Sequence, residues 1–284
     1  MNFPTIIFKL EQVTVDYVSD TSGKPALNEV SFEIPQGSWT AVIGDNGSGK
    51  STLSKVLSGF IPVSGGRRVL AEGHTAYAVL QNPETQLLGE TVDEELQLSL
   101  HGLTDMDALE KENRMRELLD EVGLSIPLDR PVKHLSGGQK QLLNLACCLG
   151  AGADSILFDE ATSMLDPGSR KSVLEAADRL HRLGTTILWV THRTEELCFA
   201  DRILLLEQGQ VSFDGTTEQF FYGQQDQEEG GYNPGVPSPC ERFGYEPPYV
   251  VQTVRSLHKR GYMPQARPLF PAQLSEAVKR CQLQ

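Results

Sequence analysis

The sequence predicts an α/β fold in which helices cover a largely parallel β-sheet, and three observations predict it. A glycine-rich loop, Gly44–Thr52, lies between a segment rich in β-branched residues and a helical segment. In the second half of the chain, short apolar segments alternate with helical stretches, which is typical of a parallel sheet between helices. A polar stretch rich in Gly and Pro then precedes a small helical part at the C-terminus.

The N-terminal elements are predicted from β propensity and turn residues. Residues 6–43 are expected to form strands, because "FKLEQVTVDY", "VSFEI" and "WTAVI" favour β-structure and the turn Pro35–Ser38 separates the last two. A helix from about Lys50 to Gly59 should follow the glycine-rich loop. A short polar hairpin over Gly65–Gly73 should then lead into a strand over Thr75–Leu80.

The segment from Gln81 to about Leu149 has a helical pattern. Thr91 with Glu94, and Ser136 with Gln139, have the spacing of capping boxes. A stop glycine, Gly123, follows "MDALEKENRMRELLDEV". Apolar strand segments come next, and helical stretches are expected in the intervals between them: Ile156–Phe158, Thr186–Val190 and Arg202–Glu207.

Three regions are predicted along the chain. Residues 1–221 form one large domain, with a helical subdomain at about 82–149, residues 222–245 form a polar linker, and residues 246–284 form a C-terminal helical extension. Two helices of this size bury little apolar surface alone, so they should pack on the main domain or on a partner. Their apolar faces carry Val250, Val251, Val254 and Leu257 before Gly261, and Leu274, Ala277 and Val278 after Pro271.

Composition excludes several classes of protein. A net charge of −13 over 284 residues, without a Lys/Arg-rich stripe, disfavours nucleic-acid binding. The apolar runs are too short for a membrane helix, and "MNFPTIIFKLEQ" lacks the layout of a signal peptide. The five cysteines include no C-x-x-C pair, so reduced, mostly buried thiols in a cytosolic protein are expected.

The loop "AVIGDNGSGKST" fits the phosphate-loop pattern G-x-x-x-x-G-K-[ST], with Gly44, Gly49, Lys50 and Ser51 at the fixed positions. The glycines let backbone N–H groups turn inward around an anion. Lys50 would reach the β- and γ-phosphates, and the Ser51 hydroxyl would take one Mg²⁺ coordination place. An ordinary Gly-rich turn is the structural alternative, and kinases, GTPases and motor ATPases share this loop.

Two further motifs restrict the class of phosphate-binding protein that the sequence can encode. "LSGGQ" occupies Leu135–Gln139, downstream of the phosphate loop. "ILFDEAT" is an apolar strand that ends in Asp159 and Glu160. A carboxylate at the end of a strand can hold Mg²⁺, and its neighbour can polarise an attacking water. A lone Asp-Glu pair would more often be a solvated surface pair, but the preceding apolar strand favours the catalytic interpretation.

In these motifs the sequence resembles the nucleotide-binding subunits of ATP-binding-cassette (ABC) transporters. The resemblance covers about residues 8–221, and its parts stand in the family's order: the phosphate loop, Gln81 in "VLQNPE", the signature "LSGGQ", Asp159–Glu160, Asp166 in "SMLDP" and His192 in "VTHR". It implies a phosphate-loop ABC ATPase with a mixed parallel sheet core, an N-terminal antiparallel β-subdomain, a helical subdomain and a C-terminal helical extension. The implied ligands are ATP and Mg²⁺.

The resemblance also implies a role for each motif residue. Glu160 is the general base, His192 contacts the γ-phosphate, and Gln81 completes the water and Mg²⁺ shell. Tyr17, expected on a strand, matches the aromatic residue that stacks on adenine, with a half-buried strand aromatic as the alternative. The implied metal ligands are Ser51, Gln81 and Asp159. The implied nucleotide-binding residues are Tyr17, Gly44, Asn46, Gly47, Ser48, Gly49, Lys50, Ser51, Thr52, Ser136, Gly137, Gly138, Gln139 and Asp166.

A single signature motif beside a single phosphate loop implies a dimer. In this architecture Ser136 and the N-terminal amides of its helix form an anion site for the γ-phosphate bound by a second subunit. Two ATP molecules would lie between the chains, with Asp166 in a loop that crosses the interface. The second ATPase subunit is either a paralogue or another copy of this chain.

A finer resemblance is to the ATPase subunits of energy-coupling-factor (ECF) importers of vitamins or trace metal ions, and to the first of their two paralogues. "QNPETQ", "DEATSMLDP" and the tail "EPPYVVQTVRSLHKRGYMP" carry it. The implied partners are a second ATPase, a membrane scaffold that contacts Gln81–Thr91, and a substrate-binding membrane protein. The chain would then lie peripherally at the cytoplasmic face of a bacterial membrane.

Other ABC proteins are the alternatives. They are the ATPase of a binding-protein-dependent importer of amino acids, metal ions or peptides, a non-transport protein of repair or translation, and a subunit with an inactive site. Three departures from the ECF pattern stand out: Leu142 replaces an Arg, the stretch from Thr52 to Gln81 is short, and the linker is acidic. None of them alters a phosphate-facing position.

Overall fold

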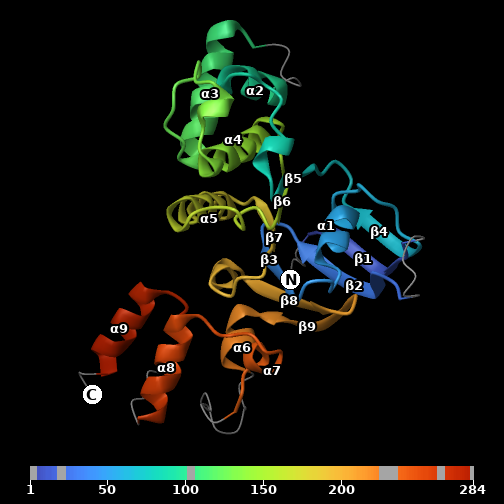
Figure 1. The fold of residues 1–284 in the computed structure, drawn as a ribbon, viewed down its shortest axis with the longest axis vertical. Helices are drawn as coiled ribbons and strands as arrows, with labels where there is room; N and C mark the ends of the chain where they lie inside the picture. The colour runs from blue at the N-terminus through green and yellow to red at the C-terminus, as the bar shows by residue number, and fades with distance from the viewer. Residues whose placement is uncertain (1–4, 18–23, 101–105, 224–235, 261–265, 282–284) are drawn as a thin grey trace.

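The computed structural model describes residues 5–17, 24–100, 106–223, 236–260 and 266–281. Two β-sheets form the body of the molecule, with a group of helices at one end and the C-terminal helices at the other (Figure 1). The α/β fold class and its mixed sheet core are confirmed. None of the helices in the described ranges is long and apolar enough to span a membrane.

The central sheet has the order β5-β6-β7-β3-β8-β9. Its strands are β3 (Trp39–Gly44), β5 (Ala76–Leu80), β6 (Ser155–Asp159), β7 (Thr186–Val190), β8 (Arg202–Glu207) and β9 (Gln210–Thr216). All neighbouring strands are parallel except β8 and β9. The two central strands β3 and β7 are buried along their whole length, and apart from Thr40 and Thr186 their side chains are apolar, as is typical of strands covered on both faces.

The register of these strands brings the site residues together. Leu80 pairs with Asp159, Asp159 with Val190, and Val190 with Val42. The carboxyl ends of β5, β6 and β7 therefore lie at one level along one edge of the sheet, and β3 continues past this level to Gly44. Ligands of open α/β sheets bind outside this edge.

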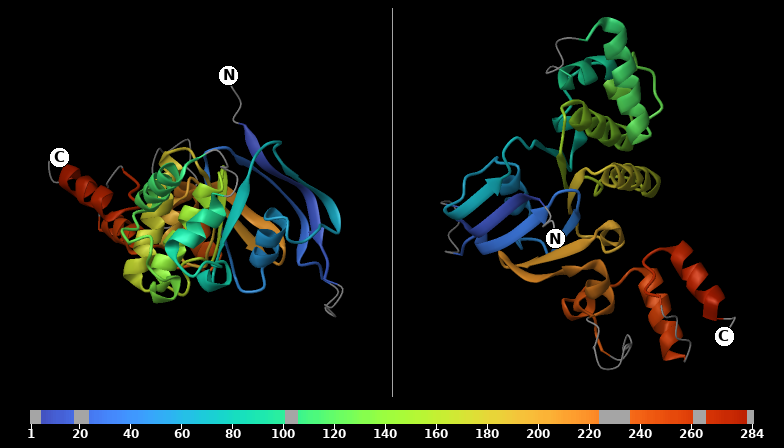
Figure 2. Two further views of the ribbon diagram at one scale, coloured as in Figure 1. Left: turned by 90° about the horizontal axis from the view of Figure 1, so that it is seen from above. Right: turned by 180° about the vertical axis from the view of Figure 1, so that it is seen from behind.

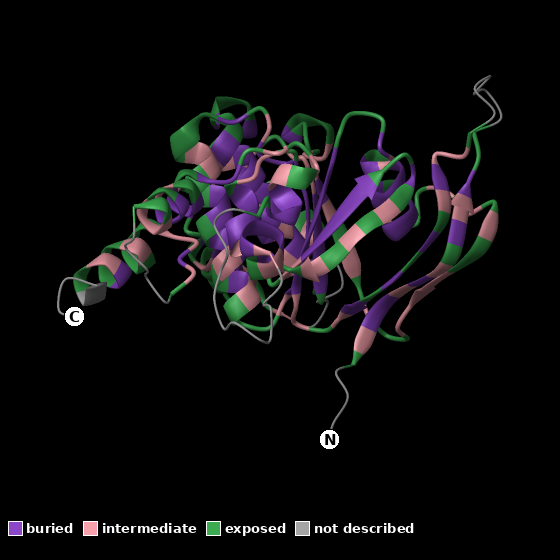
Figure 3. Ribbon diagram, turned by 90° about the horizontal axis from the view of Figure 1, so that it is seen from below, coloured by how far each residue is buried: buried purple, intermediate pink, exposed green. Residues whose placement is uncertain are grey.

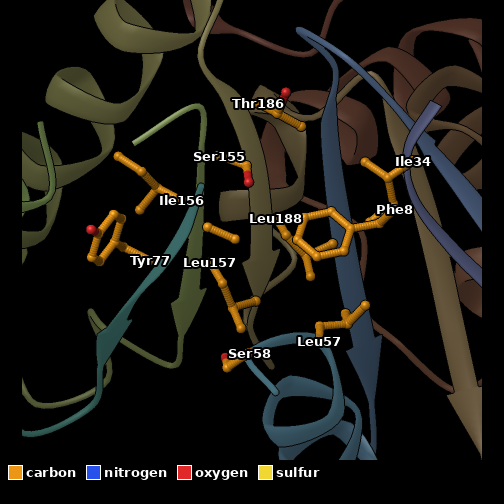
Figure 4. A pocket seen from close by; sticks show the side chains of 11 residues that line it. Phe8, Ile34, Leu57, Ser58, Tyr77, Ser155, Ile156, Leu157, Thr186 and Leu188 are labelled. Carbon is orange, nitrogen blue, oxygen red and sulfur yellow. The ribbon is translucent and has the colours of Figure 1, made fainter. Parts of the chain in front are cut away.

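A second, antiparallel sheet consists of β1 (Ile6–Val15), β2 (Leu27–Pro35) and β4 (Gly65–Leu70), in the order β2-β1-β4. It packs on the central sheet and on α1 (Lys50–Leu57) through a shared apolar cluster. Figure 4 shows the junction, where Phe8 and Ile34 approach Leu188 around an apolar hollow of about 10 Å³. The lining residues Ser155 and Thr186 begin their strands, so this hollow lies at the sheet edge opposite the site.

The helical subdomain consists of α2 (Val92–Ser99), α3 (Ala108–Val122) and α4 (Gly137–Gly150), and α5 (Pro167–Arg182) packs between it and the central sheet (Figure 1). Buried residues concentrate on the central strands and on the inward faces of these helices (Figure 3). Leu142, where the family pattern has Arg, is only 6% exposed and belongs to the main core cluster. Leu142 therefore makes an apolar packing contact at the position where the family pattern has Arg.

The C-terminal helices α6 (Thr217–Tyr222), α7 (Pro239–Arg242), α8 (Tyr249–Lys259) and α9 (Pro271–Cys281) lie on the side away from the antiparallel sheet (Figure 2). Val251 and Val254 of α8 are fully buried in the main core cluster. The Phe199 and Phe270 rings meet edge to face at 5.1 Å, and the Tyr222 hydroxyl donates to the Pro268 carbonyl at 2.6 Å. The extension therefore packs on the main domain, which is one of the two arrangements that the sequence predicts.

Several local predictions were wrong. The predicted hairpin at Gly65–Gly73 contains the single strand β4, which pairs with the free edge of β1. Gly66 is needed there, because a Cβ would lie 2.2 Å from the Gln12 carbonyl oxygen where β1 bulges. Thr91 caps α2, but the Glu94 carboxylate accepts from the Glu90 N–H at 2.8 Å, so the capping box is not closed.

Other differences lie around the last strands. The interval between β7 and β8, where a helical stretch was predicted, holds the short 3-10 helix Glu196–Phe199 and no α-helix. Strand β9 and the short helix α6 follow β8 without having been predicted. Helix α7 lies inside the predicted linker, and its Cys240 is fully buried. Of the linker, residues 224–235 lie outside the described residues.

The cysteines fit the expectation of thiols. Cys147, Cys148, Cys198 and Cys240 are free, and all but the partly buried Cys147 are buried. Burial raises the pKa of the Cys148 and Cys198 thiols to about 12, so both are protonated at neutral pH. The side chain of Cys281 lies outside the described residues.

Candidate active site

The phosphate loop connects the end of β3 to the start of α1. Gly49 precedes α1 with a left-handed backbone at φ 106°, and Gly47 has φ 83°, two conformations that L side chains rarely adopt. A Cβ on Gly44 would lie 2.4 Å from the Leu206 carbonyl oxygen. The glycines therefore allow the tight path of the loop, and the open N-terminus of α1 offers unpaired N–H groups to an anion.

Lys50 lies over this loop. Its Nζ donates to the carbonyl oxygens of Gly44 at 2.7 Å and Asp45 at 3.0 Å, and the residue is 5% exposed. Burial lowers the pKa of the ammonium, and the nearby carboxylates of Glu160, Asp45 and Asp159 oppose this shift. A phosphate oxygen at the loop would compete with two carbonyl acceptors for the same charged donor.

The acidic pair lies at the end of β6. Burial raises the pKa of the Asp159 carboxyl, although a hydrogen bond from Ser54 lowers it in part. Ser54 is one turn after Ser51 on α1, so Ser51 lies on the helix face that Asp159 meets. Glu160 has φ 49°, a strained backbone for a non-glycine residue, and its N–H donates to the Val190 carbonyl at 3.0 Å. This bond fixes Glu160 beside the end of β7.

His192 and Gln81 complete the same edge. Nδ1 of His192 is 3.9 Å from Oε2 of Glu160, and the imidazole remains 50% exposed. Gln81 directly follows β5, whose last residue, Leu80, is paired with Asp159. Gln81, Glu160 and His192 thus follow the carboxyl ends of β5, β6 and β7, at the edge of the sheet where the phosphate loop follows β3.

The side chains that the sequence assigns to a metal have the donor atoms that Mg²⁺ prefers. The hydroxyl of Ser51, the carboxylate of Asp159 and the amide oxygen of Gln81 are hard oxygen donors. Among the described residues, no group of three His, Cys, Asp or Glu could hold a metal. A site of one carboxylate and one hydroxyl fits an ion that shares its coordination with substrate phosphates and water.

Tyr17 lies just beyond β1 rather than on a strand, and its side chain is 39% exposed. Its hydroxyl is 3.3 Å from Oγ1 of Thr52 in α1. The aromatic ring is therefore adjacent to the helix that begins at the phosphate loop. This position is compatible with stacking on a base whose phosphates occupy the loop.

The signature residues lie at the N-terminus of α4, in the helical subdomain (Figure 1). Ser136 and Gln139 form the predicted capping box: the Gln139 N–H donates to Ser136 Oγ at 3.3 Å, and the Ser136 N–H donates to Gln139 Oε1 at 3.0 Å. Ser136 and Gly137 are exposed. The helix start is therefore open to an anion from outside the chain.

Asp166 has a structural role that the sequence reading missed. It caps α5, with Oδ1 accepting from the N–H groups of Gly168 at 2.9 Å and Ser169 at 3.1 Å. Hydrogen bonds from Ser169 to the Asp166 carboxylate are the main reason that the pKa of Asp166 lies below its usual value. This residue fixes the start of α5 behind the loop "SMLDP".

We expect Gly138→Ala to destabilise the contact between α4 and α5. A Cβ there would lie 2.5 Å from Cβ and Oγ of Ser169, so the two helices must move apart. The expected loss is about 1–3 kcal/mol of unfolding free energy, measured by urea denaturation. Gly137→Ala is the control, because its Cβ would meet only a flexible Leu165 methyl at 3.3 Å. Equal stabilities for both variants would refute a tight helix contact.

Gln141 is a buried residue that links the signature helix to the catalytic edge, and sequence reasoning missed it. Its Nε2 donates to the carbonyl oxygens of Leu80 and Ala161, each at 2.8 Å. Leu80 precedes Gln81, and Ala161 follows Glu160. The side chain thus joins α4 to the two loops that carry the predicted catalytic groups. Its place two residues after the signature was the only sequence signal.

Glu196 is the second residue that sequence reasoning missed. It is 1% exposed, and its carboxylate accepts from Thr162 Oγ1 at 2.7 Å, Thr191 Oγ1 at 2.6 Å and Trp189 Nε1 at 2.9 Å. Arg170 Nε lies 3.7 Å away. Thr162 follows Glu160 by two residues, and Thr191 precedes His192. Glu196 therefore ties together the loops that present these two side chains.

The chain is similar in sequence to ABC transporter ATP-binding proteins. The sequence model described as "ABC transporter" matches residues 27–163. The energy-coupling factor transporter ATP-binding protein EcfA1 of Halalkalibacterium halodurans is 37% identical over 93% of this chain and 95% of its own length. The corresponding EcfA protein of Methanosarcina acetivorans is 34% identical over 96% of this chain and 98% of its own length.

Solved structures give the same result for the fold. The cbiO1 protein of Clostridium perfringens, part of the ABC transporter complex cbiONQ, matches with a TM-score of 0.67 and 26% identity, over 76% of this chain and 90% of its own. A dimeric ATP-binding cassette in a post-hydrolysis state, bound to ADP and phosphate, matches with a TM-score of 0.65 and 25% identity, over 74% of this chain and 99% of its own.

Proposed function

Because this chain belongs to the ABC transporter family, among the energy-coupling-factor ATP-binding proteins, we propose that it binds and hydrolyses ATP at the sheet edge that carries its phosphate loop. The protein is an ATPase that couples ATP hydrolysis to transport in an ECF-type importer. The observation that supports this placement most strongly is the register Leu80–Asp159–Val190–Val42, because it brings the residues that follow β5, β6 and β7 to the edge of the sheet where the phosphate loop begins.

Each group then has one task. Lys50 exchanges its bonds with the Gly44 and Asp45 carbonyls for the β- and γ-phosphates, and the loop amides hold the remaining oxygens. Ser51, Asp159 and Gln81 would hold Mg²⁺, which neutralises charge that develops on the phosphates. Glu160 takes the proton of the attacking water. His192, whose Nδ1 lies 3.9 Å from the Glu160 carboxylate, contacts the γ-phosphate. Tyr17 stacks on adenine.

The site becomes complete only with a second ATPase subunit. Ser136, Gly137, Gly138 and Gln139 lie on the helical subdomain, and the open start of α4 supports contact with a phosphate held by another chain. The similar dimeric cassette bound to ADP and phosphate supports this arrangement. The second subunit is a paralogue or another copy of this chain, with Asp166 near the contact.

Membrane partners would meet the segment Gln81–Thr91. Leu88 is 82% exposed there, and Glu84 and Glu90 are exposed carboxylates, which suits an amphipathic partner helix with basic residues. The Nζ of Lys140 in α4 lies 2.5 Å from Oε1 of Glu84. A displacement of this segment would therefore be transmitted to the signature helix. The chain would lie at the cytoplasmic face of the membrane through a scaffold protein and a substrate-binding protein for vitamins or trace metal ions.

Purification of the intact complex tests this proposal. We expect the chain to co-purify with a second ATPase, a scaffold and a small substrate-binding membrane protein, and the complex to hydrolyse ATP only with Mg²⁺ present. Intact-complex mass spectrometry and phosphate release would measure this. Isolation with a homodimeric ATPase pair on a large permease, together with dependence on a soluble binding protein, would instead favour the other importer class.

A further inference from the structure

A short segment of the C-terminal extension lies against the phosphate loop. Ser238 and Glu241 form a capping box at the start of α7, and Cys240 behind them is fully buried. The chain turns at Gly244, where φ is 81°, and the Tyr245 N–H donates to the Cys240 carbonyl at 2.9 Å. Pro247 and Pro248, which follow Tyr245 and Glu246, are also buried. The segment is thus anchored at both ends.

Two adjacent residues of this segment contact two loops of the active site. The Tyr245 hydroxyl donates to Asp45 Oδ1 at 3.0 Å, and the Glu246 carbonyl accepts from Thr194 Oγ1 at 2.8 Å. Asp45 belongs to the phosphate loop, and Thr194 is two residues beyond His192. The segment therefore bridges the loop that would hold the phosphates and the loop that presents His192.

The contact at Asp45 matters because of charge. The Asp45 carbonyl holds Lys50, while its exposed carboxylate lies on a loop that is built to receive anions. Burial, and then the hydrogen bond to Asp45, raise the pKa of Tyr245 well above its usual value, so the hydroxyl stays a donor at any physiological pH. A carboxylate without this donor is free to turn toward bound phosphates, which would repel it.

We propose that Tyr245 is a positioning residue for the phosphate loop, which holds the Asp45 side chain so that the loop can accept the phosphates of ATP, and that the C-terminal extension thereby sets nucleotide affinity. This inference rests on the proposed function of the loop. It adds a contact from outside the ABC motifs to the residues that shape the site.

The test is a double-mutant cycle with Tyr245→Phe and Asp45→Asn, measured as ATP affinity of the full-length chain and as kcat and KM of the assembled complex. Tyr245→Phe keeps the ring, so the fold should persist, and the dissociation constant for ATP should rise by roughly three- to tenfold, the net scale of one ordinary hydrogen bond. KM should rise in parallel while kcat stays within about twofold. In the Asp45→Asn background, Tyr245→Phe should have no further effect.

Tyr249→Phe is the matched control, because Tyr249 is 60% exposed on α8. Unchanged affinity in Tyr245→Phe, or an equal loss in the Asp45→Asn background, would overturn the inference. A lower kcat with unchanged KM would also overturn it, since that pattern means a role in catalysis rather than in phosphate binding. Wild-type chain that binds no ATP would refute the proposed function itself.

Discussion

Glu160→Gln is expected to lower ATP turnover of the assembled complex by a factor of roughly 10²–10⁴, the usual contribution of a general base. The variant keeps the size and shape of the side chain but cannot accept the proton of the attacking water. Phosphate contacts come from Lys50 and the loop amides, so ATP should still bind and remain trapped. Single-turnover phosphate release and retained nucleotide would measure both effects.

Glu195→Gln provides a matched control, because Glu195 is exposed and lies on the loop that follows His192. We expect its turnover to stay within about twofold of the wild type. If Glu160→Gln turned over at the wild-type rate, another group would have to be the base. Loss of ATP binding in this variant would instead place Glu160 in nucleotide binding.

Glu196→Ala is expected to lower the free energy of unfolding by about 3–5 kcal/mol. The change removes a carboxylate that accepts from Thr162, Thr191 and Trp189, and it leaves these donors without their acceptor. It also removes the negative charge 3.7 Å from Arg170, whose side chain is only 17% exposed. Urea denaturation of the full-length chain would measure the loss.

A graded comparison separates charge from hydrogen bonding at this position. Glu196→Gln keeps an acceptor oxygen but not the charge, so its free energy of unfolding should lie between those of the wild type and Glu196→Ala. Glu195→Ala, one residue earlier and exposed, should change stability by less than about 0.5 kcal/mol. A Glu196→Ala protein as stable as the wild type would refute the network as a structural support.

Most of the fold and the composition of the site could be predicted because they depend on local patterns. The apolar segments around Phe158 and Trp189 are buried strands, and the glycines of the phosphate loop have backbones that only glycine adopts readily. The capping box of Ser136 and Gln139 is likewise set within four residues. In each case the sequence holds both partners of the interaction close together.

The features that could not be predicted depend on partners far apart in the chain. Glu196 stands in the charged stretch "RTEEL", where a carboxylate normally faces water, and only the fold brings Thr162 and Trp189 to it. Strand β4 is short and polar, and it forms because an edge of β1 is free. Tyr245 is 200 residues away from Asp45, and no periodicity connects them.

The level strand ends of the central sheet have a consequence for how this sequence can change. Side chains of a strand alternate between its faces, and each residue advances the chain by about 3.3 Å. A deletion of one codon inside β6 would therefore turn Asp159 to the opposite face or pull Glu160 back from His192. The coding sequence of β5, β6, β7 and β3 should tolerate exchanges of one apolar residue for another far better than any change of length.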